Sequence, residues 1–146
     1  MKRGTRILGL AGLLGVLAAC QGPSTALPAM SVETKMTADN LCALGVSPAI
    51  ALGRVPARAA RYRVRVQNVG VLFGAAQDFD VPATPQGLAA GALETYRGVC
   101  PGERQRFEIR IEVLAVDAQG RALAYGATSQ SVSSTTSMLR AVPPTP

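Results

Sequence analysis

Two stretches of this chain alternate polar and apolar residues so strictly that both must be β-strands. Residues 61–68, RYRVRVQN, place Tyr62, Val64 and Val66 on one face and three arginines on the other. Residues 106–117, RFEIRIEVLAVD, repeat the pattern. A period of two is the signature of a half-buried strand, because successive side chains point to opposite faces. In the second stretch, the residues expected to face the core are Phe107, Ile109, Ile111 and Val113, and those expected to face water are Glu108, Arg110 and Glu112.

The rest of the chain contains short apolar runs separated by glycine and proline turns. The run 45–52 and a short strand ending at Pro82 are of this kind, and AQGR at 118–121 has the composition of a hairpin turn. Only 86–96, QGLAAGALETY, has a helical composition, and its glycines limit any helix to a turn or two. The pattern predicts an all-β, mostly antiparallel sandwich or barrel.

The N-terminus has the pattern of an export signal. Three basic residues among the first six precede the apolar run 7–19, which is too short to span a bilayer, since that takes about 20 residues. The run ends in Leu17-Ala18-Ala19-Cys20, which resembles the lipobox of bacterial lipoproteins. In those proteins the cysteine receives a lipid and becomes the new N-terminus. The alternative is an ordinary signal peptide that happens to end near a cysteine.

The lipobox resemblance implies an anchor and a location. Acyl chains on Cys20 would hold the chain to a membrane, each buried CH₂ contributing about 0.8 kcal/mol. Gln21 follows, where many Gram-negative lipoproteins retained at the inner membrane have aspartate. We therefore expect a bacterial envelope protein, lipid-anchored to the outer membrane and facing the periplasm.

Composition divides the chain into four parts. Residues 1–19 are the expected signal peptide, and 20–38 are the lipidated N-terminus and a linker rich in Pro, Ser, Thr and Ala. The end of that linker alternates weakly and can form a first strand. Residues 39–132 are the expected β-sandwich domain, and 133–146 are a small, polar, Pro-rich tail.

With Cys20 lipidated, Cys42 and Cys100 remain. An exported chain sits where disulfides persist, so these two thiols are expected to pair. Two free, buried thiols are the alternative. Two cysteines without any histidine give no complete zinc site, and no metal or other cofactor is expected.

The charge and residue content argue against several functions. Twelve basic and nine acidic residues remain after the signal peptide, which is a mild net charge, and no nucleic-acid motif accompanies it. Without histidine there is no Ser-His-Asp or Cys-His arrangement. Asp78 and Asp80 share one face of a strand and form a carboxylate pair, but a pair facing water or an arginine is the simpler interpretation. The arginines of 61–65 form a binding surface or a solvated row.

Two segments resemble a known family. Residues 45–66, GVSPAIALGRVPARAARYRVRV, resemble the family pattern (N/D)VSPxLxW…VPxxTxxYxV. Residues 79–126, FDVPATPQGLAAGALETYRGVCPGERQRFEIRIEVLAVDAQGRALAYG, resemble YDIPA…LxxGA…YxGPCPPxGxHxYxFxVxALDxxGxxLxxG. Both patterns belong to the phosphatidylethanolamine-binding, Raf-kinase-inhibitor-like family. The resemblance implies a two-sheet, mostly antiparallel sandwich with a small pocket that binds anions such as phosphate head groups.

Carried over by position, the residues that line the family's pocket are all replaced by non-ionisable ones. Its DPD turn falls near Gln67 and Asn68, and its HW pair falls near Ala75. In its HxY element, Gln105 replaces the histidine and Phe107 the tyrosine. The resemblance therefore implies a scaffold with a modified pocket.

The loop 96–105, YRGVCPGERQ, corresponds to the rim of that pocket. Tyr96 belongs to it, and Arg97 and Arg104 are candidates to contact an anion, because guanidinium suits phosphate. Their alternative role is as loop-surface charges. Arg106 should point away from Phe107, and so away from the pocket.

Three functions follow. The first is a non-catalytic, membrane-anchored module that binds a lipid head group or small anion. The second is an interaction lipoprotein without a small ligand, acting through the arginine-bearing strand. The third, an enzyme using Asp78 and Asp80, has the least support.

Overall fold

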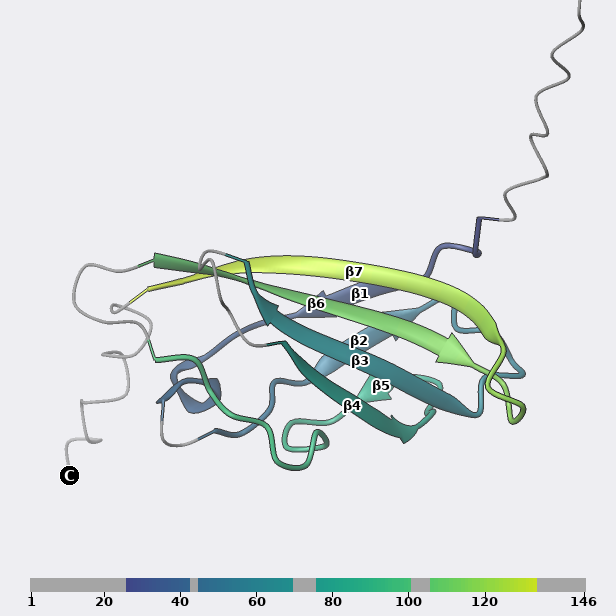
Figure 1. Cartoon of the computed structure of the whole chain (residues 1–146), viewed down its shortest axis with the longest axis horizontal. Helices are drawn as coiled ribbons and strands as arrows, with labels where there is room; N and C mark the ends of the chain where they lie inside the picture. Colours follow the sequence, from purple (N-terminus) through teal and green to yellow (C-terminus); the bar gives the residue numbers. More distant parts are fainter. Residues whose placement is uncertain (1–25, 43–44, 70–75, 101–105, 134–146) are drawn as a thin grey trace, which may run out of the picture.

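The computed structural model describes residues 26–42, 45–69, 76–100 and 106–133, which fold into two antiparallel sheets facing each other (Figure 1). The smaller sheet has the strand order β1-β2-β5, and the larger has β4-β3-β6-β7. The all-β sandwich expected from the sequence is therefore confirmed. The elements are β1 (Ser31–Thr34), the 3-10 helix η1 (Ala38–Asn40), β2 (Ile50–Gly53), β3 (Arg61–Asn68), β4 (Gln77–Pro82), β5 (Gly87–Leu88), β6 (Arg106–Val116) and β7 (Ala122–Ser133). In these parts of the chain no helix is long and apolar enough to cross a bilayer.

The larger sheet has one buried and one exposed face, as the alternation predicts. In β3, Tyr62, Val64 and Val66 are at most 2% exposed, whereas the arginines between them are exposed. β3 pairs with β6 so that Val64 lies opposite Val113. The residues of β6 expected to face inward, from Phe107 to Val113, contribute to the same core. Each buried side chain of this size contributes roughly 1.5–3 kcal/mol, so the facing apolar rows hold the sheets together.

On one side the sandwich is closed by the segment that leads into β1. The backbone N–H of Met30 donates to Tyr125 O (2.9 Å), and that of Tyr125 donates to Pro28 O (3.1 Å). Farther along β7, the Gln130 side chain accepts from the Met36 N–H (2.6 Å) and donates to the carbonyl of the last β1 residue (2.5 Å). The entering chain therefore lies along β7, the edge strand of the larger sheet.

β1 lies inside the range 20–38 that composition assigns to the linker. The weak alternation of polar and apolar residues there is sufficient to form a strand with one buried face, because Val32 is buried while Glu33 is exposed. β1 pairs with β2 along its whole length. The chain thus joins the fold at Pro28, well before the domain boundary expected at residue 39.

The stretch 86–96 contains a short strand and turns, and no helix. Gly87 and Leu88 pair with β2, and Gly87 and Gly91 have φ angles of 105° and 81°. Only glycine adopts this region easily. A Cβ on Gly87 would also overlap the Ile50 carbonyl oxygen, so the glycine permits the close pairing of β5 with β2.

The sandwich has two distinct ends, visible in Figure 1. We call the end at which the chain enters the sandwich the tether end. The entering chain lies there beside the β2–β3 loop 54–60 and the β6–β7 turn 117–121, because Ser31 pairs with Gly53 and the Ala60 N–H donates to Val116 O. At the loop end lie η1 and the segment 96–100, near the last residue of β3. The distinction determines where each candidate site falls.

The hairpin turn predicted from the AQGR motif joins β6 to β7, and the Asp117 carboxylate just before the motif holds it. Asp117 accepts from the N–H groups of Gln119 (3.0 Å) and Arg121 (2.9 Å) and from the Arg121 guanidinium (2.7 Å). These bonds, chiefly that from the Arg121 backbone, lower the pKa of Asp117. Gly120 has a φ of 78°, which completes the turn.

Gly126→Ala is expected to lower the free energy of unfolding by about 1–3 kcal/mol, the usual cost of overpacking. Gly126 faces inward, and a Cβ there would collide with the Met30 carbonyl oxygen and with Val32. Urea unfolding followed by circular dichroism measures the change. Ala127→Ser, on the exposed face of the same strand, should change it by less than about 0.5 kcal/mol. If Gly126→Ala is equally neutral, the segment before β1 does not lie on β7.

Candidate functional site

The loop 96–100, expected to form the pocket rim, is fastened to the segment after η1. Cys42 and Cys100 form a disulfide, with Cα atoms 4.3 Å apart, as predicted. The Cys42 N–H donates to Val99 O (3.3 Å). A Cβ on Gly98 would lie 2.7 Å from the Leu41 carbonyl carbon, so glycine is needed for this close approach. The loop is therefore pre-positioned by covalent and backbone contacts.

Asn40 joins η1 to the same loop. Its side-chain oxygen accepts from the Thr37 N–H (2.6 Å), and its amide donates to Val46 O (2.9 Å). The backbone carbonyl of Asn40 accepts a hydrogen bond from the Tyr96 hydroxyl at 3.1 Å. Burial raises the pKa of Tyr96 to about 12. Tyr96, expected at the pocket, is thus a neutral, buried group whose hydroxyl holds η1.

A side chain of β4 fixes the backbone at Arg97. The Gln77 amide donates to Arg97 O, its carbonyl oxygen accepts from the Arg97 N–H, and both distances are 2.8 Å. The Arg97 side chain is exposed and has no hydrogen-bond or ion-pair partner among the described residues. The arrangement holds the Arg97 backbone in place, and no side chain or carbonyl of the described residues engages its guanidinium.

The other described pocket candidates do not share one surface. Gln67 and Asn68 are consecutive in β3, so their side chains point to opposite faces of the sheet. Asn68 is 8% exposed and continues the buried row, whereas Gln67 continues the row of arginines. Phe107 is partly buried and packs against the core. The inner face at the loop end therefore carries Asn68 and Phe107, and Gln67 belongs to the outer face.

Several predicted positions lie outside the described residues. They are Ala75, Arg104 and Gln105 of the expected pocket, and Cys20 with the signal peptide. Their predicted roles rest on the sequence.

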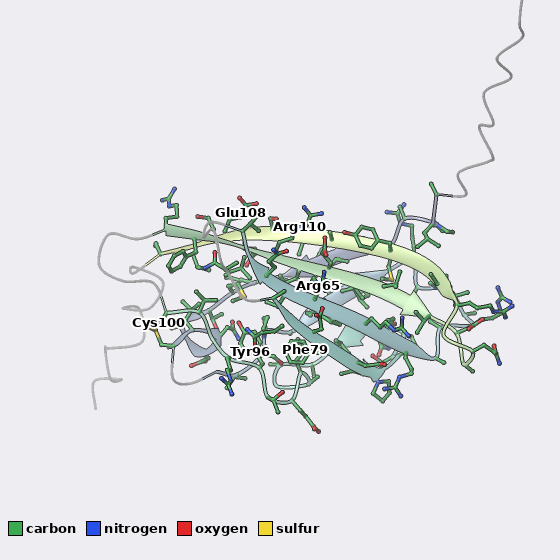
Figure 2. The ribbon with its side chains drawn as sticks, viewed as in Figure 1. Arg65, Phe79, Tyr96, Cys100, Glu108 and Arg110 are labelled. Carbon is green, nitrogen blue, oxygen red and sulfur yellow. A yellow bond between two sulfur atoms is a disulfide. The ribbon has the colours of Figure 1, made fainter. Side chains whose placement is uncertain are left out.

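A groove that the sequence did not suggest runs between β4 and the loop 87–95. It has a volume of about 630 Å³, and its apolar lining includes Phe79, Val81, Leu88 and Ala92. Phe79 lies beside Tyr96, with ring centroids 6.4 Å apart, as Figure 2 shows. β4 is the edge strand on the side opposite β7, where the two sheets are not closed by a further strand of the described chain. The groove thus extends from the open side of the sandwich toward the Tyr96 loop.

The outer face of the larger sheet carries ion pairs between arginines and aspartates of neighbouring strands. Arg65 binds Asp78 through two hydrogen bonds (2.7 and 3.1 Å), and Arg61 binds Asp80 (2.5 Å). The bond from Arg65 lowers the pKa of Asp78. Both aspartates therefore face arginines on the neighbouring strand, which was the simpler interpretation of the pair. Of the arginines at 61–65, Arg63 alone has no described partner.

A second groove crosses this outer face. It has a volume of about 460 Å³ and is lined in part by Arg63, Leu114 and Tyr125. The Tyr125 hydroxyl donates to Glu112 (2.9 Å), which also pairs with Arg110 (3.0 Å). Figure 2 shows Arg110 and Glu108 on this face, away from Tyr96. Within the described ranges, no three Cys, Asp or Glu residues come together as a metal site.

Comparisons with known proteins address the fold. No protein-family profile matches the sequence, and no curated protein matches it. The chain is similar to the crystal structure of a phosphatidylethanolamine-binding protein homologue from Chlamydia trachomatis, with a TM-score of 0.57 and 15% identity. The match covers 71% of this chain and 97% of that one.

The described sandwich is therefore a domain with the fold of phosphatidylethanolamine-binding proteins. The resemblance suggested by residues 45–66 and 79–126 is confirmed at the level of the fold.

Replacing both Cys42 and Cys100 by serine is expected to lower the free energy of unfolding by about 4 kcal/mol, from the chain-entropy model for a loop of this size. The two cysteines are 58 residues apart in sequence. Urea unfolding with and without a reductant measures the effect. The reductant should destabilise the original chain and leave the double variant unchanged. An original chain indifferent to the reductant would contradict the bond.

Proposed function

We propose that this chain is a lipid-anchored, non-catalytic binding protein of the bacterial envelope. Its sandwich binds a small anion, such as the phosphate of a lipid head group, at the loop end. The anchor is lipidated Cys20, joined to the sandwich by a short linker. The phosphate-binding fold of the resemblance and the export signal support this combination.

The observation that carries the binding proposal is the arrangement around Arg97. Gln77 holds the backbone of Arg97 at both its N–H and its carbonyl, and the disulfide fixes the loop three residues later. The guanidinium itself has no described partner. A fixed backbone with a free cation reduces the ordering cost of binding an anion, and guanidinium is well suited to phosphate. Arg97 thereby supplies a charge in place of the ionisable groups that the family pattern has and this chain lacks.

The same contacts favour binding over catalysis. The chain has no histidine. Asp78 and Asp80 are each held by an arginine, and Tyr96 is buried with its hydroxyl bonded to a backbone carbonyl. We find no described pair of groups placed to exchange a proton with a ligand.

Arg97→Gln is expected to weaken phosphate binding by about tenfold or more, since a hydrogen bond to a charged group contributes about 1.5–3 kcal/mol. Titrating the protein with inorganic phosphate and with phosphoethanolamine, followed by the backbone amide signals of residues 96–100, measures the affinity. The two probes distinguish a general anion site from one that also recognises the amine. Arg106→Gln, an exposed arginine on the outer face, is the matched control and should bind as the original chain does. Equal affinity for both variants, or no binding at millimolar phosphate, would contradict the proposal and favour an interaction lipoprotein without a small ligand.

Cys20→Ser is expected to move the protein from the membrane fraction to the soluble fraction of its host, because the lipid has lost its attachment atom. Cell fractionation and incorporation of labelled fatty acid measure this. Gln21→Ser, which keeps the cysteine, should remain lipidated. A Cys20→Ser protein that still incorporates labelled fatty acid, or that stays in the membrane fraction after a high-salt wash, would overturn the anchor.

A further inference from the structure

The tether end carries a basic surface that is separate from the loop-end site. The elements at this end carry five arginines: Arg54 and Arg58 in the loop 54–60, Arg61 and Arg63 at the start of β3, and Arg121 in the β6–β7 turn. Three described acidic residues lie near this end: Asp80 and Asp117, which are already engaged, and Glu33, which is exposed in β1 two residues after Ser31. Asp80 pairs with Arg61 (2.5 Å), and Asp117 pairs with Arg121 (2.7 Å).

Three of these arginines remain without a partner among the described residues. Arg54, Arg58 and Arg63 are exposed, and no described hydrogen bond or ion pair neutralises them. Arg54 and Arg58 belong to the loop after β2. Arg63 extends from β3 toward the turn at Gly120, where an added Cβ would lie 3.7 Å from the Arg63 guanidinium. We call Arg54, Arg58 and Arg63 the tether-end arginines.

The chain enters the sandwich beside these arginines. Ser31 pairs with Gly53, the residue before Arg54. Cys20 lies six residues before Ala26, where the described chain begins. Six residues span at most about 20 Å when fully extended. A lipid on Cys20 would therefore keep the tether end close to the membrane surface.

The apolar groups at the same end suit a lipid surface. Leu27 is 40% exposed and precedes Pro28, whose carbonyl accepts from the Tyr125 N–H, and Tyr125 is 37% exposed on the outer face. An aliphatic side chain and an amphipathic ring beside cations are the combination found at membrane–water interfaces.

We propose that the tether-end arginines bind the phosphates of anionic phospholipids, so that the tether end of the domain contacts the membrane in which the lipid on Cys20 is anchored. The orientation rests on the proposed lipid anchor, whereas the affinity for anionic lipid does not. The loop end, with Arg97, then points away from that membrane and is open to ligands from the periplasmic side. Each basic residue near an anionic surface adds attraction that salt screens.

Vesicle sedimentation tests the affinity with a chain beginning at Gln21, which lacks the lipid. Every described core residue and both cysteines of the disulfide lie between Met30 and Val132, so this chain retains the complete sandwich. It should bind vesicles that contain phosphatidylglycerol more tightly than vesicles of phosphatidylcholine alone, and less tightly as salt is raised. Replacing Arg54 and Arg58 by glutamate should weaken binding to the anionic vesicles by at least about tenfold.

The matched control replaces Lys35 and Arg106 by glutamate. Both are exposed, neither has a described partner, and they change the net charge by the same amount as the first pair. This control should keep most of the affinity. Equal weakening of vesicle binding by the two double substitutions would show that binding depends only on net charge, and would overturn the proposal. The absence of any preference for anionic vesicles would also overturn it.

A second measurement tests the orientation on the lipidated protein. The chain has no tryptophan, so a single introduced one is a unique reporter. Ala57→Trp, in the loop that carries Arg54 and Arg58, should be quenched by brominated lipids, whereas Glu94→Trp should not. Equal quenching of the two would overturn the end-on orientation even if anionic vesicles bind. Failure of a high-salt wash to release Cys20→Ser from membranes would instead reject the anchor and leave the vesicle result standing.

Discussion

The contact between the entering chain and β7 is the constraint on which the rest of the structure depends. Backbone bonds at Pro28 and Met30 and the side chain of Gln130 hold this segment along the edge of the larger sheet. Gly126 makes the contact possible, because any Cβ there would collide with the segment. An edge strand with free N–H and C=O groups invites pairing with other chains, and here the protein's own N-terminal segment covers it.

Because the entering chain covers the β7 side of the sandwich, the β4 side is the more open one among the described residues. No described segment covers the β4 edge in this way, and an apolar groove of about 630 Å³ lies there, next to the loop 87–95. The same closure decides where the chain enters, and so which end of the sandwich is near the linker. The two candidate surfaces consequently occupy opposite ends. The tether-end arginines lie beside the entering chain, and Arg97 lies at the far end on a loop fixed by the disulfide.

The motif resemblance is confirmed for the fold, and the pairing of Cys42 with Cys100 followed from counting thiols. It was less informative about individual side chains. Positional matching placed Gln67 and Asn68 together, but consecutive strand residues face opposite ways, and only Asn68 faces the core. Tyr96 holds η1 rather than a ligand, since its hydroxyl bonds to Asn40. No pattern in the sequence pointed to Gln77, because its role depends on a backbone twenty residues away.

Local periodicity determined the strands, their buried faces and the all-β class, because alternation reports directly on which side of a strand meets the core. The sequence by itself also predicted the pairing of the two remaining cysteines, which the structure confirms. The tertiary structure alone decided which charges are neutralised. Strand register brings Asp78 and Asp80 to Arg65 and Arg61 and leaves Arg63 without a partner in the described part of the chain, and register is a long-range property that no local pattern encodes. For the same reason, only the fold could separate an end that carries the linker from an end that carries Arg97.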